Sequence, residues 1–400
     1  MSPSVVLLVD PRDEIGGDSL VHLELIRHLD RSRIRPIVLC HDRGPLPARY
    51  LELEDTDAWS IDCGTRSKRQ PRSGLAGWTS WLRSAGFSLR AFREAWRLAR
   101  QHEVRLIHSS NTRRGAALGQ ALSRALRVPW LMHGHSVIGT SAVDRHFARA
   151  ADKIACVSRV TRDAYRRVDV PEDRLELIEN AVAASRMVPR LGGAELRLRL
   201  GIPEAATVAG WVGRLTPSKG PEVFLEAAAI VARRHPGLHF VLVGDAEIFD
   251  ANRDYESELL RLTRDLGLCE RVSFTGFLED VASAYDAFDI SVVTTRDEGF
   301  GLVGVESMLA GLPIVSSRIG AIPDILDHER TALLVTPGAP RAVADALTRL
   351  IENPEEARRL GDAARQSAQE RFAPERQARS FEALYERMME ASLESMSAAR

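Results

Sequence analysis

Residues 290–311, ISVVTTRDEGFGLVGVESMLAG, contain in succession an apolar run, a glycine-rich turn and a helical pattern. The run ISVVTT predicts a buried strand, and VESMLAG predicts a helix that begins at about Val303. The glycines of EGFGLVG let backbone N–H groups face a ligand where the helix starts. Carboxylates stand at Glu298, where the turn begins, and at Glu306, which we expect in the first turn of the helix. This arrangement predicts a binding loop of an α/β sheet.

A second loop of similar construction lies at residues 211–220 (WVGRLTPSKG). It follows the strand pattern TVAGWVG and leads into the helical pattern PEVFLEAAAIVARR. Gly213 permits close backbone approach, while Arg214 and Lys219 place two cations beside a helix N-terminus, where an anion is favoured. The loop therefore indicates a phosphate site. A solvated turn is the alternative, although only three of the 54 basic residues are lysines.

Short apolar runs alternate with amphipathic helical patterns along the whole chain, which is typical of βαβ units and doubly wound parallel sheets. The segment 181–193 has no clear period and contains a proline and a glycine pair, so it predicts the linker between two domains. We expect domains over residues 1–182 and 183–372. Residues 373–400 predict a C-terminal helix that can pack back on the first domain.

The composition agrees with two domains, because 400 residues exceed what one compact core usually holds. No run of about 18 uncharged apolar residues predicts a membrane-spanning helix, and the first apolar run is too short for a signal peptide. The four cysteines lack metal-binding spacing and are expected to be reduced core residues of a cytoplasmic protein. They stand at positions 40, 63, 156 and 269.

Charge is unevenly distributed, which predicts two domains with different partners. Residues 1–190 contain 31 basic and 22 acidic side chains, whereas residues 191–400 contain 23 and 33. Residues 65–101 interleave arginines with aromatic residues, a pattern found on surfaces that contact anionic membranes or nucleic acid. We expect peripheral membrane contact there and no nucleic-acid partner. Within this segment, residues 89–101 predict a surface helix with Leu89, Phe92, Trp96 and Ala99 packed inwards, and residues 65–88 predict a long loop.

GRLTPSKG, followed about eighty residues later by EGFGLVGVESMLAGLPIVSS, resembles the family 4 glycosyltransferases, retaining enzymes of GT-B fold that use nucleotide-sugar donors. Five further segments occur in the family's order: EIGGDSLVHLELIRHL, LMHGH, CVSRVTRDAY, VLVGD and VSFTGFLEDV. The resemblance implies a GT-B architecture, in which two Rossmann-like doubly wound domains face a central cleft.

The resemblance also assigns roles to the two loops. In the family, the first glutamate of the glycine-rich motif contacts the transferred sugar and the second binds the ribose hydroxyls, which implies Glu298 and Glu306. The arginine and lysine of the other loop bind the diphosphate, which implies Arg214 and Lys219. The alternative is that Glu306 merely favours the helix dipole and Glu298 is a solvated acid. The implied donor-binding residues are Gly16, Gly17, Arg214, Lys219, Glu298, Gly299, Phe300, Gly301, Leu302, Val303 and Glu306.

His133, in LMHGH, matches the family's histidine near the reaction centre, and Gly134 makes it a better match than His135. With Glu298, Arg214 and Lys219 it completes the implied catalytic set. Arg159 and Asn180 are weaker candidates from the motifs CVSR and IENAV.

Two cations and two helix N-termini can meet the negative charge that develops on a departing diphosphate, so we expect no metal or cofactor. The sequence has no DxD-like cluster on a suitable loop and no set of His, Cys or Asp residues spaced as metal ligands. No first-domain carboxylate is marked as a nucleophile, which favours same-face attack assisted by the departing phosphate. Asp18, the turn Asn180-Ala181-Val182-Ala183, Thr294-Thr295 and Ser307 depart from common family residues.

The sequence therefore predicts a retaining hexosyltransferase that moves a sugar from a UDP- or GDP-linked donor to an acceptor hydroxyl. The acceptor classes left open are lipid-linked, saccharide and small-molecule hydroxyls, in polysaccharide, glycolipid or glycoconjugate synthesis. The alternatives are a nucleotide-sugar epimerase of the same fold and a non-catalytic sugar-nucleotide-binding protein. A nicotinamide-dependent dehydrogenase is disfavoured, because DPRDEIGGDS lacks GxGxxG.

Overall fold

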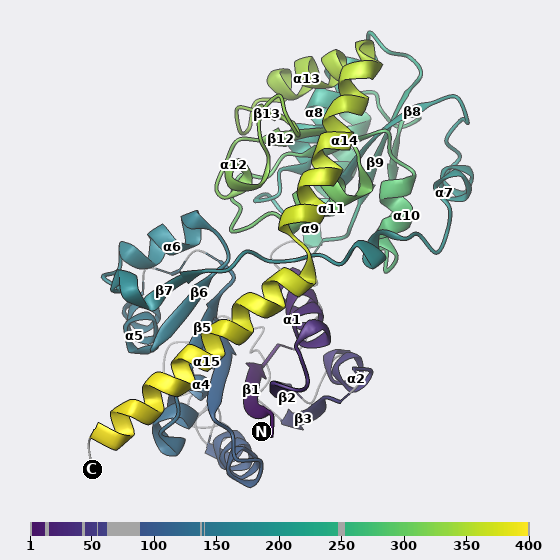
Figure 1. Cartoon of the computed structure of the whole chain (residues 1–400). Helices are drawn as coiled ribbons and strands as arrows, with labels where there is room; N and C mark the ends of the chain where they lie inside the picture. The colour runs from purple at the N-terminus through teal and green to yellow at the C-terminus, as the bar shows by residue number, and fades with distance from the viewer. Residues whose placement is uncertain are drawn as a thin grey trace, which may run out of the picture. The chain divides into compact units, whose positions relative to one another are not determined.

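The structure is a computed structural model (Figure 1). It describes residues 2–12, 16–41, 45–53, 55–61, 89–136, 138–139, 141–246 and 253–398. The chain forms two compact units, of which unit 1 comprises Met1–Ala181 with Pro374–Arg400, and unit 2 comprises Val182–Ala373. The chain therefore crosses between the units twice. At these crossings the backbone N–H of Val182 donates a hydrogen bond to the carbonyl oxygen of Phe372 at 3.1 Å.

Unit 1 is built on a seven-stranded parallel sheet in the order β3-β2-β1-β4-β5-β6-β7. Because β1 lies between β2 and β4, the winding direction reverses beside it. The strands are β1 Ser4–Asp10, β2 Ile34–His41, β3 Asp57–Ile61, β4 Leu106–Ser110, β5 Trp130–Gly134, β6 Lys153–Cys156 and β7 Leu175–Leu177.

Helices cover both faces of this sheet, since alternate side chains of a strand point to opposite faces. Val6 and Leu8 of β1 pack with α1, α2 and α15, whereas Leu7 and Val9 pack with the helix over residues 89–101, α4, α5 and α6. The helices are α1 Gly17–His28, α2 Leu46–Leu51, α4 Arg113–Leu126, α5 Ala142–Ala150, α6 Arg159–Arg166 and α15 Pro374–Ala398, with a 3-10 turn at Glu172–Arg174.

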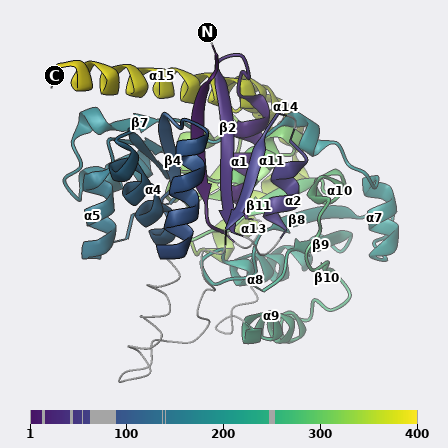
Figure 2. The same cartoon turned by 90° about the horizontal axis from the view of Figure 1, so that it is seen from below.

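The last helix, α15, completes the core of unit 1 (Figure 2). A stripe of its apolar residues follows a helical period and is buried, at Phe381, Leu384, Tyr385, Met388 and Met389, whereas Leu393 near its end is 50 % exposed. Burying one such side chain fully is worth about 1.5–3 kcal/mol, so this stripe outweighs the helix's weak intrinsic stability.

Unit 2 repeats the same architecture with a six-stranded parallel sheet in the order β10-β9-β8-β11-β12-β13. Its strands are β8 Thr207–Val212, β9 Leu238–Val243, β10 Val272–Phe274, β11 Ile290–Val293, β12 Ile314–Ser317 and β13 Leu333–Val335. Its helices are α7 Gly193–Arg199, α8 Pro221–Ala232, α9 Arg253–Asp265, α10 Val281–Asp286, α11 Leu302–Ala310, α12 Ile322–Ile325, α13 Pro340–Glu352 and α14 Pro354–Arg371, with a 3-10 turn at Ala184–Met187.

Several local expectations differ from the structure. Leu89 is 65 % exposed rather than packed inwards, although Ala99 is buried and Phe92 and Trp96 pack against the core. Cys269 is exposed rather than a core residue. The expected loop over residues 65–88 lies outside the described residues. Among the residues that the structure describes, no helix is long and apolar enough to cross a membrane.

Candidate functional site

Two predicted loops of unit 2 meet at one point of the sheet. The first follows β8 and the second follows β11, and these two strands are hydrogen-bonded neighbours. Between them the strand order reverses, because β9 lies on the other side of β8. Crevices at the carboxyl ends of strands at such a reversal are the usual ligand sites of open α/β sheets.

The β8–α8 loop runs from Gly213 to Gly220, and its backbone requires glycine at its end. Gly220, the N-cap of α8, has φ 64°, a left-handed conformation that favours glycine. A Cβ there would lie 2.4 Å from the carbonyl oxygen of Thr294 at the end of β11, so the two loops also approach closely. The side chain of Arg214 is exposed and that of Lys219 is half-buried.

Hydrogen bonds join the two loops directly. The Thr294 hydroxyl donates to the carbonyl oxygen of Gly220 at 2.7 Å and accepts from the Trp211 indole at 3.0 Å. The backbone N–H of Arg296 donates to the carbonyl oxygen of Ser218 at 2.8 Å. The loops therefore form one rigid surface, and the threonine that replaces a common family proline supplies one of the contacts.

The structure brings two predicted catalytic residues into contact. Lys219 Nζ lies 2.6 Å from Glu298 Oε2, and the two side chains are 24 % and 16 % exposed. A partly buried ion pair of this kind holds both groups in place while leaving them accessible to a ligand. Glu298 is fixed further, because its carbonyl oxygen accepts a hydrogen bond from the N–H of Ala321 at 3.0 Å.

The glycine-rich stretch from Gly299 to Val303 leads into α11, which begins at Leu302. Gly301 caps this helix with φ 113°, again a conformation for glycine. Phe300 is buried and meets Phe372 edge-on, with ring centroids 5.9 Å apart. The first N–H groups of α11 lack partners within their own helix and are available to an anion or hydroxyl.

Glu306 lies in the second turn of α11 and not in the first, so the prediction about its place in the helix is wrong. Its carboxylate is nearly buried, accepts a hydrogen bond from the Tyr285 hydroxyl at 3.0 Å and lies 3.7 Å from Arg186 Nη2. Burial raises the pKa of Glu306, while Arg186 and the bond from Tyr285 act in the opposite direction. A buried carboxylate past the first turn is not explained by the helix dipole, so the alternative reading of Glu306 loses its support.

In unit 1, Gly16 and Gly17 lie where α1 begins, with Gly16 as its N-cap. Gly16 has an ordinary extended backbone with φ −132°, and a Cβ there would meet nothing within 4 Å. Neither packing nor conformation of the described chain therefore requires glycine at this position. The open space around it leaves room for a ligand to approach the helix N-terminus.

His133 is fully buried on β5, within a cluster of four histidines. Its Nδ1 lies 3.3 Å from Nε2 of His22 and 3.3 Å from Nε2 of His108. His135, 6 % exposed, places its Nε2 3.0 Å from the same His22 nitrogen. The competing candidates His133 and His135 thus belong to one cluster, with ring centroids 3.8 Å apart.

Burial lowers the pKa of His108, His133 and His135 well below the ordinary value, and neighbouring histidines add to the effect. These imidazoles are therefore neutral at physiological pH. The other His108 nitrogen, Nδ1, lies 2.7 Å from the Tyr385 hydroxyl of α15. The C-terminal helix thus helps to position the cluster.

Sequence reasoning missed half of this cluster. It identified His133 and His135 but neither His22 nor His108, which come from α1 and β4. No histidine set was expected from the sequence spacing, yet one ring nitrogen from each of His22, His133 and His135 lies within 4.8 Å of the others. The histidines are far apart in sequence, so no spacing rule could show the set.

The two weaker candidates lie in unit 1. Arg159 is exposed and begins α6, directly after Ser158, whose hydroxyl caps the helix by accepting from the N–H of Thr161. Asn180 is buried, and its Oδ1 has no hydrogen-bond partner within the described part of the chain. Neither residue belongs to the histidine cluster.

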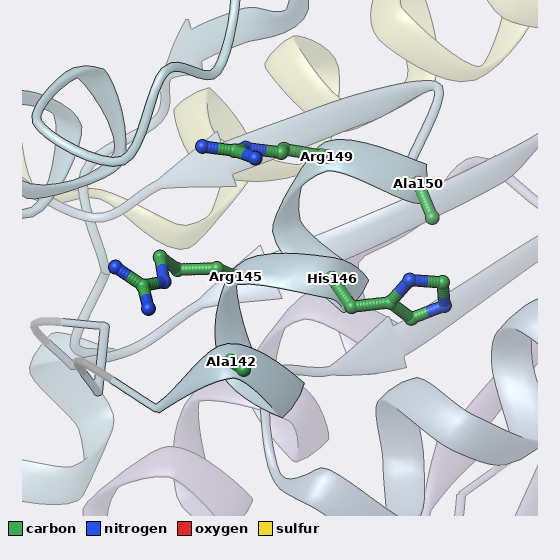
Figure 3. Close-up of a pocket in the computed structure, with 5 residues that line it drawn as sticks. All are labelled: Ala142, Arg145, His146, Arg149 and Ala150. Carbon is green, nitrogen blue, oxygen red and sulfur yellow. The ribbon is translucent and has the colours of Figure 1, made fainter.

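A shallow hollow along α5 is not the candidate site. Figure 3 shows the residues that line it, and none of the predicted site residues is among them. They are Ala142, Arg145, His146, Arg149 and Ala150.

Two family models match the chain. The model of glycosyl transferases group 1 matches residues 194–367, and the model of glycosyltransferase family 4 matches residues 15–186. The first match lies within unit 2 and contains the loops after β8 and β11. The second begins next to Gly16 and contains the histidine cluster.

Curated relatives include D-inositol 3-phosphate glycosyltransferases of several bacteria. The protein of Saccharomonospora viridis is 29 % identical over 361 residues, which are 86 % of this chain and 75 % of the relative. The protein of Acidothermus cellulolyticus is 32 % identical over 229 residues, which are 55 % of this chain. This second alignment, like several others, spans about half the length of the relative.

Solved structures share the fold. Anabaena HepE, in complex with UDP and glucose, superposes with a TM-score of 0.79 at 24 % identity and covers 94 % of this chain and 97 % of its own. Sucrose-phosphate synthase from Thermosynechococcus elongatus has a TM-score of 0.79 at 22 % identity, covering 97 % of this chain and 100 % of its own. The fold is therefore the GT-B fold of two Rossmann-like domains.

Proposed function

We propose that this chain transfers a hexosyl unit from a UDP- or GDP-linked donor to an acceptor hydroxyl with retention of configuration. The premise is that the chain belongs to the group 1 and family 4 glycosyltransferases and uses a nucleotide sugar. The observation that carries the proposal is the pair of loops after β8 and β11, joined by the 2.6 Å contact between Lys219 and Glu298. The comparisons favour a transferase over an epimerase or a non-catalytic binding protein.

The donor is held by groups of unit 2. The Glu306 carboxylate accepts hydrogen bonds from the two ribose hydroxyls, and the Glu298 carboxylate accepts one from a hydroxyl of the sugar. On donor binding, Lys219 turns from Glu298 towards the diphosphate, where Arg214 joins it. The backbone N–H groups at the start of α11 complete the site for the sugar and phosphate oxygens.

Breaking the anomeric C–O bond leaves negative charge on the diphosphate and positive charge on the sugar. The two cations and the helix N-termini stabilise the diphosphate charge, and one preorganised donor of this kind is worth about 2.7–4 kcal/mol in acyl transfer. No metal ion on the diphosphate is needed in this scheme. The family resemblance assigns His133 to the reaction centre, and the acceptor attacks the face that the phosphate leaves. Trapping a covalent glycosyl-enzyme would contradict this mechanism.

Proteins of related sequence or fold guide the choice of substrates to test. UDP is the first nucleotide to test, because HepE, which has the same fold, was crystallised with it. The relatives named D-inositol 3-phosphate glycosyltransferases point to an anionic polyol acceptor. Such an acceptor agrees with the excess of 31 basic over 22 acidic side chains in residues 1–190. Lipid-linked and saccharide acceptors are the other classes.

Peripheral contact with an anionic membrane through residues 65–101 is a separate part of the proposal. The excess of arginine among aromatic residues supports it. Flotation of the protein with vesicles of phosphatidylglycerol and phosphatidylcholine measures the contact. Failure to float with anionic vesicles at low salt would refute it.

The site is tested by thermal shift and calorimetric titration of the purified chain with UDP, GDP, ADP, dTDP and their common sugars. One nucleotide should stabilise the protein, and Glu306→Ala and Lys219→Ala should each weaken its binding at least tenfold. The matched controls are Glu226→Ala, an exposed acid on α8, and Lys153→Ala, a lysine of unit 1. Both should bind as the parent chain does.

Equal losses in the controls and in the site variants would refute the assignment of the site. If no nucleotide binds, the proposed donor class is wrong.

A further inference from the structure

Three buried histidines of unit 1 direct ring nitrogens towards one point. His22 Nε2 lies 3.3 Å from His133 Nδ1 and 3.0 Å from His135 Nε2. The three residues come from α1, from β5 and from the turn after β5, and they are 2 %, 0 % and 6 % exposed. A set of one nitrogen from each ring lies within 4.8 Å.

The two separations from His22 are close to those of ligands around a tetrahedral zinc ion. Zinc–imidazole bonds are about 2.0–2.1 Å long, which places neighbouring nitrogens of a tetrahedron about 3.3–3.4 Å apart. The two nitrogen–nitrogen distances from His22 are within a few tenths of an ångström of this value. With the third separation no longer than 4.8 Å, the three rings are close enough to share one ion.

Hydrogen bonds satisfy this arrangement only in part, although His108 Nε2 also lies 3.3 Å from His133 Nδ1. A single imidazole nitrogen offers either one N–H or one lone pair in the plane of the ring. His22 Nε2 faces both His133 and His135, so it can serve only one of them well. In addition, His135 Nδ1 and His133 Nε2 are buried and have no hydrogen-bond partner among the described residues.

A buried carboxylate lies near the second nitrogen of His22. Its other nitrogen, Nδ1, lies 3.6 Å from Asp10 Oδ2, and that oxygen accepts a hydrogen bond from the Tyr50 hydroxyl at 2.7 Å. Metal-bound histidines usually present their second nitrogen to a carboxylate, which fixes the ring and strengthens the ligand. The Asp10 side chain is 1 % exposed, so this support is itself well held.

Local charge also favours a cation. The guanidinium of Arg12 approaches His22 Nδ1 to 3.3 Å and would by itself repel a metal ion. It is paired, however, with Asp10 at 2.5 Å and with Asp18 at 3.1 Å. Two carboxylates against one guanidinium leave one negative charge beside the cluster.

We propose that His22, His133 and His135 bind one divalent transition-metal ion of the zinc class. Neutral imidazoles suit such ions, whereas Mg²⁺ and Ca²⁺ prefer oxygen ligands. The ion would join α1 to β5 and thereby stabilise unit 1. With Nδ1 of His133 on the metal, the ring proton resides on Nε2, which then acts only as a hydrogen-bond donor.

The test is metal binding to the full chain, purified without a histidine tag and stripped with EDTA. After incubation with ZnCl₂ and desalting, elemental analysis should find one zinc per chain. MgCl₂ treated alike should leave none. Co²⁺ should give the intense visible absorption of a tetrahedral site. This test uses no nucleotide, so its result is independent of the proposed transferase activity.

The variants His22→Gln and His135→Gln should each lose stoichiometric zinc, and their circular dichroism establishes that they fold. His239→Gln is the matched control, because this buried histidine of unit 2 lies outside the cluster and its Nε2 contacts Ser273 Oγ at 3.0 Å. Asp10→Asn, which alters the support of His22, should weaken zinc binding about 10–100-fold. Retention of zinc by folded His22→Gln, or absence of zinc binding by the parent chain, would overturn the proposal.

Discussion

Replacing Tyr285 by phenylalanine should weaken donor binding while leaving the fold of unit 2 intact. The Tyr285 hydroxyl donates to Glu306 Oε2 at 3.0 Å, and both side chains are buried. Phenylalanine keeps the ring and its edge-on contact with Phe288, whose centroid is 5.9 Å away. The substitution therefore removes one hydrogen bond and little packing.

The expected magnitude follows from the charge of the acceptor. A hydrogen bond to a charged group contributes about 1.5–3 kcal/mol. Arg186 remains 3.7 Å from the other carboxylate oxygen and compensates in part, so we take the lower end of this range. A loss of about 1.4 kcal/mol corresponds to a tenfold higher Kd for the nucleotide.

The pH dependence gives the prediction a second part. Burial already raises the pKa of Glu306, and the bond from Tyr285 opposes this rise. Removing the bond raises the pKa of Glu306 further. As pH is lowered, the ionised carboxylate that is proposed to accept hydrogen bonds from the ribose hydroxyls is therefore lost at a higher pH. Nucleotide affinity in Tyr285→Phe should therefore begin to fall, as pH is lowered, at a higher pH than in the parent chain.

Calorimetric titration of UDP and GDP from pH 5 to pH 8 measures both effects. Tyr165→Phe is the control, because it removes a buried hydroxyl of unit 1 that accepts a hydrogen bond from Asn111 at 3.3 Å. It should alter melting temperature without altering nucleotide affinity. An unchanged Kd and pH profile in folded Tyr285→Phe would refute the reasoning about Glu306.

Three further outcomes are expected. Arg113→Gln should lower the free energy of unfolding slightly at neutral pH. Hydrogen bonds from Arg113 and Ser141 hold the pKa of Asp144 at about 2, so this stability is present above the ordinary value of 3.8 and is lost as pH falls towards 2, as acid titration of unfolding would show. Phe381→Ala should destabilise unit 1 by about 3–5 kcal/mol in urea unfolding, since the ring is fully buried; an unchanged midpoint would contradict the packing of α15. Gly220→Ala should lower melting temperature and nucleotide affinity through its left-handed φ of 64°, whereas Gly237→Ala, where a Cβ meets nothing within 4 Å, should not.

The strands that sequence reasoning located are those with long apolar runs. β1 and β8 are buried on both faces, so hydrophobicity alone marks them. β3, with sequence DAWSI, was missed because it is an edge strand whose side chains are mostly only half-buried. β13 is only three residues long and gives no period.

The sequence revealed those parts of the candidate site whose residues are close together in the chain. The glycine-rich turn and the lysine loop each carry their own signal, whereas the contact of Arg186 with Glu306 joins residues 120 positions apart. His22 and His133 are separated by 111 positions. Such contacts arise from the order of strands in the sheet, which short sequence patterns do not encode.

The hydrogen bond between Val182 and Phe372 marks where the chain leaves and re-enters unit 1. During synthesis the ribosome therefore releases the whole of unit 2 before it releases α15. Unit 2 can complete its core first, while the face of unit 1 around Leu8 waits uncovered for Phe381 and Tyr385. The half of the protein that is made first is thus the last to finish folding, and it is the half that a premature stop codon near the end of the message would damage.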